Sequence, residues 1–387
     1  MQSAGGKGMT APASGNPVVS VVMANFRGAA HLEAAMRSVL NQTERRLELI
    51  LADDASDDGS VAIAQAVAEG DDRVRVIACA RNGGPAATRN LALEAARGDW
   101  IAVVDSDDLI HPDRLARLIA AAEAAGADLV ADDLVYFGAV PEAGGRTLLQ
   151  PLALAAPTRL GAAPWLRANG GDPALPAFGY LKPVIRRAVL GGRRYDPRLR
   201  IGEDHDLVLR LLIEGARFLL LPDPLYAYRR HAGSISHRLS VETAAAMLAA
   251  HRALPPLSGP EARAAAAAVD RQLRRALRYE RLVADLKARR WTRALPRLAD
   301  PAMASRLLES LRDRRRRKAA GARSGQDAPA SAGPLPDLPP PGRPWASPPA
   351  PAAARIAAGA LKGDPLPPGA PPWAAWLAGA TAGASAG

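Results

Sequence analysis

Hydrophobic residues in the first 140 positions follow two alternating patterns, short continuous apolar runs and longer stretches with helical spacing. The expected strands are Val18–Met23, Leu47–Ala52, Val74–Ala78, Trp100–Val104 and Leu129–Tyr136, and the helices between them are Ala30–Leu40, Val61–Ala68, Ala86–Ala96 and Pro112–Ala125. Repeated strand–helix units place helices on both faces of a sheet. Runs that are apolar throughout fit strands buried on both faces. We therefore expect an α/β fold in which helices cover both faces of a largely parallel, mixed sheet.

The second half of the chain is less regular. An irregular crossover is expected from Pro141 to Gly179, followed by a helix over Asp204–Glu214, a short strand over Phe218–Leu221 and helices over Val241–Arg252 and Pro260–Arg290. Residues 324–387 hold 15 of the 34 prolines and show almost no apolar periodicity, which is typical of a disordered segment. The predicted organisation is a disordered leader at 1–16, a catalytic domain at 17–240, a helical basic extension at 241–318 and a Pro/Ala/Gly-rich disordered tail at 319–387.

Charge is concentrated near the C-terminus. Residues 251–323 contain 20 Lys and Arg against 7 Asp and Glu, a net +13, whereas the whole chain carries +11. Basic segments bind polyanions, so an anionic membrane surface and nucleic acid are both candidate partners. The basic segment has no interleaved aromatic residues and no recognisable nucleic-acid module, which disfavours nucleic acid.

Cysteine content and hydropathy constrain the location. Cys79 is the only cysteine, so an intramolecular disulfide is excluded. No stretch approaches the roughly 18 apolar residues that cross a bilayer, and residues 1–16 lack the apolar core of a signal peptide. The expected location is the cytoplasm, with peripheral contact at the inner face of the membrane.

Acidic residues gather where the predicted strands end. Asp105 and Asp107 follow the fourth strand, and ligands in such sheets bind at the carboxyl ends of the strands. Two carboxylates one residue apart on a turn suit Mg²⁺ or Mn²⁺ bound to a diphosphate, because such sites use few protein carboxylates together with phosphate and water. A helix-capping role is the alternative. Asp204-His205-Asp206 repeats the pattern, so the bare pattern is weak.

Two other segments end at the same predicted edge. Asp53 and Asp54 close the second strand, where a carboxylate can accept hydrogen bonds from a base or a ribose. The glycine-rich turn at 81–90 leads into a helix whose N-terminus favours phosphate, with an ordinary loop as the equal alternative.

In this order, the segments of residues 17–240 resemble the family 2 glycosyltransferases. The residues that carry the resemblance are Val19-Ser20-Val21-Val22, Ser38-Val39-Leu40-Asn41-Gln42-Thr43, Glu48 to Asp58, Arg81 to Asn90, Asp105-Ser106-Asp107-Asp108 and Gly202-Glu203-Asp204-His205-Asp206-Leu207. The resemblance implies the nucleotide-diphospho-sugar transferase (GT-A, Rossmann-like) fold and an inverting, metal-dependent hexosyltransferase.

The resemblance also implies roles at matching positions. Asp54, with Asp53, matches the acid that holds the nucleoside; Asp105 matches the ribose and metal side of the family's D-x-D, and Asp107 its main metal ligand; Asp204 matches the catalytic base, with Glu203 beside it. Arg89 matches an Arg near the nucleotide pocket, and an internal salt bridge is the alternative. The family's Pro-x-Tyr-Asn is replaced here by Ala24-Asn25-Phe26-Arg27, in which Phe26 can still stack on the base.

Three later segments resemble a narrower group, the exopolysaccharide glucosyltransferases of the succinoglycan-assembly type. They are Phe178 to Val184, Arg200 to Asp204 and Tyr228 to Ser236. This resemblance implies UDP-glucose as donor and a lipid-linked oligosaccharide as acceptor. Lys182, Arg229 and His231 become candidates for contact with acceptor, phosphate or metal, and a loop packed over the site is the alternative. Another sugar donor or acceptor, a nucleic-acid-binding protein and a catalytically idle scaffold remain the competing interpretations.

Overall fold

The computed structural model describes residues 17–138, 146–230, 239–310 and 312, and the backbone of two short paired strands, β10 (Ala360–Leu361) and β11 (Asp364–Pro365). His231, the predicted leader at 1–16 and nearly all of the predicted tail at 319–387 lie outside these residues. Among the described residues, no helix combines the length and the apolar character needed to cross a membrane.

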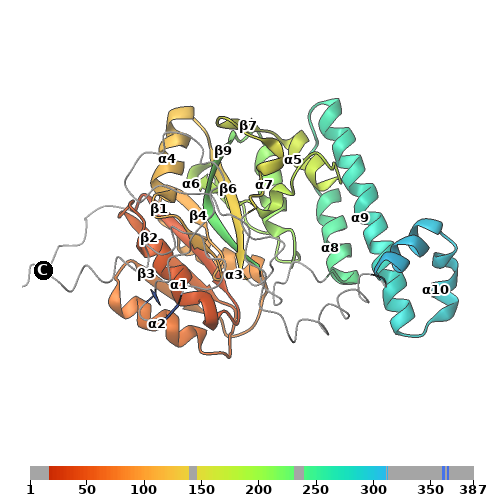
Figure 1. Ribbon diagram of the computed structural model, residues 1–387, viewed down its shortest axis with the longest axis horizontal. Helices are drawn as coiled ribbons and strands as arrows, with labels where there is room; N and C mark the ends of the chain where they lie inside the picture. The colour runs from red at the N-terminus through yellow and green to blue at the C-terminus, as the bar shows by residue number, and fades with distance from the viewer. Residues whose placement is uncertain are drawn as a thin grey trace, which may run out of the picture.

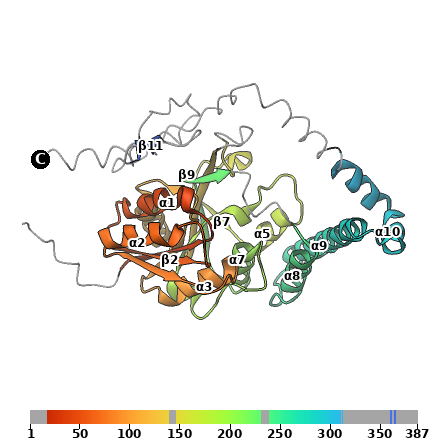
Figure 2. The same ribbon diagram turned by 90° about the horizontal axis from the view of Figure 1, so that it is seen from below.

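The first half of the chain forms a parallel sheet with the strand order β3-β2-β1-β4. Its strands are β1 (Val19–Asn25), β2 (Leu47–Asp53), β3 (Val74–Ala78) and β4 (Trp100–Val103), and its helices are α1 (Ala29–Leu40), α2 (Ser60–Gly70) and α3 (Pro85–Ala95). Helices α1 and α3 lie on opposite sides of β2 (Figure 2). These elements confirm the predicted α/β units to within two residues at each end. Strand β3 is only half-buried because it is an edge strand.

The second half extends the same sheet in mixed directions. Its elements are β5 (Leu109–Ile110), α4 (Arg114–Ala125), β6 (Leu129–Gly138), β7 (Thr158–Leu160), α5 (Ala162–Asn169), β8 (Val184–Arg186), α6 (Arg187–Leu190), α7 (Glu203–Ile213) and β9 (Phe218–Arg230). Strand β8 is antiparallel to both β4 and β6, whereas β9 is parallel to β6. The resulting nine-stranded sheet confirms the predicted mixed architecture (Figure 1).

Two predictions for this half were wrong, and one strand was not predicted. The strand expected at Phe218–Leu221 continues to Arg230, through two prolines that resembled a break because proline donates no ladder hydrogen bond. Register shifts beside Asp133 in the partner strand β6 accommodate this irregular stretch. Strand β7 and helix α5 lie within the segment predicted to be irregular, and the two-residue strand β5 was too short to show a periodicity.

The C-terminal helices pack against the preceding part of the chain. Helices α8 (Val241–Arg252) and α9 (Pro260–Lys287) pack on each other, and α9 packs on α5. Ala265 and Val269 of α9 belong to the main hydrophobic core. Only the far end of α9 and helix α10 (Trp291–Leu298) share a small core of their own, formed by Tyr279, Leu282, Ala294 and Met303. Figure 1 shows α9 beginning beside α5 and ending near α10 at the far right.

Candidate active site

A cavity of about 1160 Å³ lies where the carboxyl ends of β1, β2 and β4 meet helix α7 and the α8–α9 pair. It collects most of the residues singled out from the sequence. Phe26, Asp54, Arg89, Asp105, Asp107, Lys182, Glu203 and Asp204 all line it. Asp53 and Arg229 do not line this cavity, as the following contacts explain.

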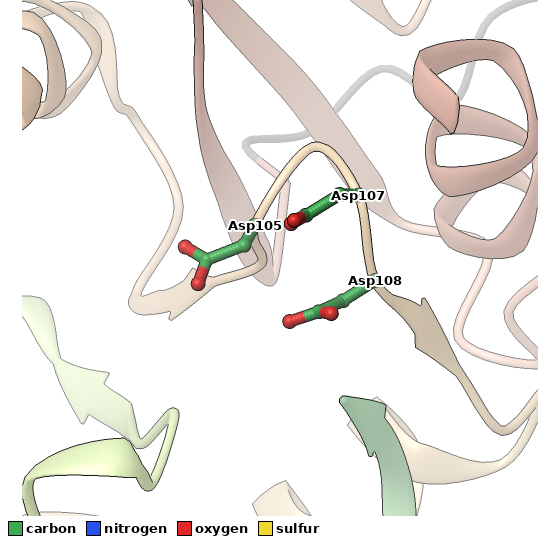
Figure 3. A group of neighbouring side chains, drawn as sticks. All are labelled: Asp105, Asp107 and Asp108. Atoms are coloured by element: carbon green, nitrogen blue, oxygen red, sulfur yellow. The ribbon is translucent and has the colours of Figure 1, made fainter. Parts of the chain in front are cut away.

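The acidic loop between β4 and β5 brings three carboxylates together. One oxygen from each of Asp105, Asp107 and Asp108 lies within 4.8 Å of the others (Figure 3). Strand β9 fixes the loop, since the Tyr226 hydroxyl donates to Asp108 at 2.7 Å and accepts from the Asp105 backbone N–H at 3.1 Å. Burial, together with the charges of Asp107 and Asp105, raises the pKa of Asp108. A divalent cation beside the three carboxylates would relieve this repulsion, so the residues present fit a metal site.

Arg229 holds the acidic loop in place through Asp107 and Asp108. Its Nε donates to the Asp107 carbonyl at 2.6 Å, its backbone N–H donates to Asp108 Oδ1 at 2.7 Å, and its guanidinium lies 4.4 Å from the centre of the Phe137 ring. These contacts agree with the alternative of a packed residue and do not direct Arg229 toward a phosphate. Local sequence could not predict this contact, because it joins positions 122 residues apart.

Two buried cations bridge the acidic loop to the start of α7. Arg89 bonds Glu203 at 2.5 Å and Asp105 at 2.8 Å, and lies 3.6 Å from Asp204. Lys182 lies 2.8 Å from both Asp105 and Asp204. Arg89 therefore makes the internal salt bridges considered from the sequence while still lining the cavity, and Lys182 is held by two carboxylates.

This network sets the charge of Asp105. Burial alone would raise its pKa, but the charges of Lys182 and Arg89 outweigh burial and hold the pKa of Asp105 well below its usual range. The pKa of Lys182 is correspondingly raised, because Asp105 and Asp204 more than offset its burial. Both carboxylate oxygens of Asp105 are therefore engaged by cations, Oδ1 by Arg89 and Oδ2 by Lys182.

Asp54 ties the end of β2 to the glycine-rich turn. Its two carboxylate oxygens accept from the backbone N–H groups of Gly83 at 2.7 Å and Gly84 at 2.9 Å. Two backbone amides of the turn that the sequence offered to a phosphate are therefore already bound by Asp54. Each oxygen of Asp54 keeps a second lone pair, and the residue still lines the cavity.

Asp53, the last residue of β2, does not line the cavity. One of its oxygens accepts from Asn25 Nδ2 at 2.7 Å and the other from the Ser56 N–H at 2.8 Å. Asn25 Oδ1 is buried, with no hydrogen-bond partner in the described part of the chain. A Cβ at position 28 would stand 2.2 Å from that oxygen, so glycine is required there. Because a buried acceptor without a donor is costly, a ligand N–H or O–H would complete Asn25.

The residues that replace the family's Pro-x-Tyr-Asn divide between two tasks. Phe26 is 41% exposed at the cavity, where its ring can cover a base. Arg27 bonds both oxygens of Asp57, at 2.7 and 2.8 Å, and its N–H donates to Ser56 Oγ at 2.8 Å. The loop after β1 therefore holds Arg27 in an ion pair with Asp57.

Arg200 is a cavity residue to which sequence reasoning assigned no role. It is exposed, lies beside Gly84 and makes no ion pair with a described residue. The signal in the sequence was its position two residues before Gly202 at the start of α7. Its guanidinium is the cation best placed to reach a diphosphate, because Arg89, Lys182 and Arg27 are all paired with carboxylates.

Arg200→Gln is therefore expected to raise the donor KM about tenfold, the size of one charge-assisted hydrogen bond, with little change in kcat. Arg198→Gln is the matched control, since Arg198 is spent on Asp196 at 2.6 Å. Steady-state kinetics against donor concentration measure both. Equal KM values for the two variants would remove Arg200 from the donor site.

The mixed sheet with an acidic loop at its carboxyl edge has the GT-A fold, and glycosyltransferases match it among solved structures. Among solved structures, that of residues 1–349 of TarS from S. aureus in complex with UDP-GlcNAc matches with a TM-score of 0.53 at 20% identity, covering 63% of this chain and 68% of that one. The mannosyltransferase PcManGT from Pyrobaculum calidifontis, in complex with GDP-Man and Mn²⁺, matches with a TM-score of 0.50 at 17% identity, covering 77% and 80%.

The sequence places the chain more narrowly. The family described as Glycosyl transferase family 2 matches residues 20–174. The succinoglycan biosynthesis protein ExoO of Rhizobium meliloti is 39% identical over 241 residues, which are 61% of this chain and 68% of ExoO. ExoU of the same organism is 32% identical over 226 residues, 57% of this chain and 65% of ExoU. The chain belongs to glycosyl transferase family 2, and its relatives of the succinoglycan type confirm the narrower resemblance.

Proposed function

We propose that this chain transfers one sugar, glucose from UDP-glucose, to a lipid-linked oligosaccharide during bacterial exopolysaccharide or cell-surface polysaccharide synthesis, with inversion at the anomeric carbon. The observation that carries the proposal is the placement of Asp204 in the same cavity as the acidic loop, joined to it through Lys182. An acceptor and a donor diphosphate can then meet between a base and a cation site.

The donor side is proposed to use the β1 and β2 ends and the acidic loop. Phe26 covers the base, while Asp54 and the unpartnered Asn25 Oδ1 accept from base or ribose donors. Asp53 acts indirectly, by holding Asn25. Glucose and uridine are what the resemblance to the succinoglycan-assembly group implies, and the matching structures that hold UDP-GlcNAc and GDP-Man make another donor the competing candidate.

Asp107, with Asp105 beside it, would hold Mg²⁺ or Mn²⁺ together with the donor diphosphate. When bound, the ion offsets the negative charge that develops on the departing diphosphate. Arg200 adds a second positive contact at the mouth of the cavity.

Asp204 is proposed as the general base. An acceptor hydroxyl loses its proton as it attacks the anomeric carbon, and a carboxylate within hydrogen-bond reach takes that proton. Lys182 and Arg89 orient Asp204 and neutralise part of its charge, while Glu203 is spent on Arg89. Attack from the side opposite the diphosphate inverts the configuration.

Helices α8 and α9 are proposed as the acceptor wall. Met247, Ala250, His251, Leu254, Val269, Gln272 and Leu273 line the cavity from this side. A Cβ on Gly202 would lie 3.5 Å from the Met247 methyl, so Met247 lies beside the residue two positions before Asp204. The acceptor would therefore pass between Met247 and the acidic loop.

Met247→Trp should narrow this passage and raise the acceptor KM about tenfold or more, while donor hydrolysis stays within a few-fold of the wild type. Met247→Leu, which nearly conserves volume, is the control. Kinetics with varied acceptor and separate donor-hydrolysis assays supply the comparison. A rise in donor KM with an unchanged acceptor KM would place the acceptor elsewhere.

The experiment that tests the function is a screen of the purified full-length chain. UDP-glucose, UDP-GlcNAc, GDP-mannose and other nucleotide sugars are supplied with Mg²⁺ or Mn²⁺, and nucleotide release is measured with and without a lipid-linked oligosaccharide. We expect the largest release with UDP-glucose and an increase when acceptor is added. Release from none of the donors would overturn the proposal, and preference for another donor would replace glucose.

We further propose that the enzyme works in the cytoplasm at the inner face of the membrane, because the acceptor is lipid-linked. Nucleic-acid binding through the basic segment is the function from a different class. The donor site and the family assignment both favour sugar transfer over it.

A further inference from the structure

The outer end of the helical region displays large apolar side chains to solvent. We define the tip as residues 287–310. It comprises the end of α9, helix α10 and the helical residues 301–310. Trp291 is 55% exposed, Leu295 60% and Leu308 55%. The other exposed large apolar side chains in the described part of the chain, Phe26 at the cavity and Leu91 on α3, are less exposed, at 41% and 40%.

Helix α10 exposes half of a continuous apolar face. Residues 291, 294, 295 and 298 fall on one side at 3.6 residues per turn. Ala294 is fully buried and Leu298 packs against the small core, so these two residues attach the helix. Trp291 and Leu295 lie on the neighbouring, exposed part of the same face. The fold therefore uses half of this face and leaves the other half available.

Positive charge is concentrated on α10 and on the residues just before it. Residues 287–298 contain five Lys and Arg and no Asp or Glu. Arg297 pairs with Asp285 of α9. Arg289, Arg290 and Arg293 are exposed and make no ion pair with a described residue. The combination of an aromatic side chain, leucines and unpaired arginines is typical of helices that lie in the interface of a membrane.

We propose that the tip docks on an anionic membrane, with Trp291, Leu295 and Leu308 entering the headgroup region and Arg290 and Arg293 contacting lipid phosphates. A second copy of this chain is a poorer occupant, because two tips face to face would bring like charges together. The proposal rests on the proposed function only for the reason to be at a membrane, namely the lipid-linked acceptor.

The position of the tip also bears on the acceptor. Leu273 lines the cavity, and α9 ends 14 residues later at Lys287, about 21 Å further along at 1.5 Å per residue. Figures 1 and 2 both place α10 beyond the end of α9, away from the sheet. The catalytic cavity thus stands off from the docked surface. This offset favours an acceptor that extends from the bilayer, as an oligosaccharide does.

The test is flotation of the full-length chain with vesicles of phosphatidylcholine alone or mixed with phosphatidylglycerol. We expect binding to the anionic vesicles only, weakened by added salt. The double variant Trp291→Ser with Leu295→Ser should lose about tenfold or more in affinity. Arg290→Gln and Arg293→Gln should each lose about fivefold. Leu91→Ser with Arg75→Gln, the same types of change on exposed residues of α3 and β3, should bind as the wild type does.

Three results would overturn the proposal. The first is equal vesicle binding by the wild type and the tip variants, and the second is absence of binding to anionic vesicles. The third is loss of self-association by the tip variants in sedimentation velocity without vesicle binding, which would identify a second copy as the occupant. Donor hydrolysis by the same variants should stay at the wild-type rate. Failure of the sugar-transfer proposal would leave the vesicle result intact, so the two are separable.

Discussion

Asp204→Asn is expected to lower kcat by about 10²–10⁴-fold and to leave the donor Kd nearly unchanged. A positioned base contributes a factor of this size, and it acts on the acceptor proton only in the transition state. The structure supports this reading because Asp204 opens α7 at the cavity, with Lys182 2.8 Å away. Turnover by coupled assay and donor Kd by calorimetry measure the two quantities.

Asp206→Asn is the matched control for that variant. It makes the same change two residues further along α7, where Asp206 is bound to Arg210 at 2.9 Å. We expect its kcat within a few-fold of the wild type. Normal turnover by Asp204→Asn would show that another group is the base, and Glu203→Gln would then be examined.

Asp107→Ala is expected to remove most activity, at least about 10²-fold, and to weaken donor binding as well. A metal ligand acts in the ground state, since the ion joins the enzyme to the donor diphosphate, and the ion supplies several kcal/mol of charge stabilisation. EDTA should likewise silence the wild type, and added Mn²⁺ or Mg²⁺ should restore it. Binding of Mn²⁺ by the variant, followed by electron paramagnetic resonance, gives a readout that does not depend on turnover.

The control for this variant is Asp72→Ala, a change at an exposed acid between α2 and β3. It should retain both Mn²⁺ binding and activity. Full activity of the wild type in excess chelator would exclude a metal requirement. Donor binding at wild-type strength by Asp107→Ala would instead move the metal role to Asp105 or Asp108.

Asp204→Asn and Asp107→Ala distinguish the roles of two residues for which the sequence predicted only a place at the same edge of the sheet. Asp105 and Asp107 follow a strand, and Asp204 opens a helix about 100 positions later. Local spacing cannot say that one lysine touches both Asp105 and Asp204. Lys182 makes that link because β8 inserts antiparallel between β4 and β6 and places the preceding residues beside the acidic loop.

The fates of Arg89 and Arg229 illustrate the same limit. Both arginines were open to a ligand role or a packing role in the sequence. Arg89 is held by acids from two segments, and Arg229 lies under the acidic loop. Burial and partner choice decided these outcomes, because an arginine removed from water needs carboxylates or carbonyls around it. Neither the burial of an arginine nor the identity of its partners can be predicted from the local sequence.

The sequence by itself determined the strands and helices of the first half, the edge at which the acids gather and the family, because hydrophobic period, strand-end position and motif order are local properties. The tertiary structure alone decided which charges pair, that Asp54 occupies the amides of the glycine-rich turn, and that α8 and α9 fold back to wall the cavity. It also decided which half of α10 remains exposed. These features depend on contacts between segments far apart in the sequence, and on which surface is left once the core has been buried.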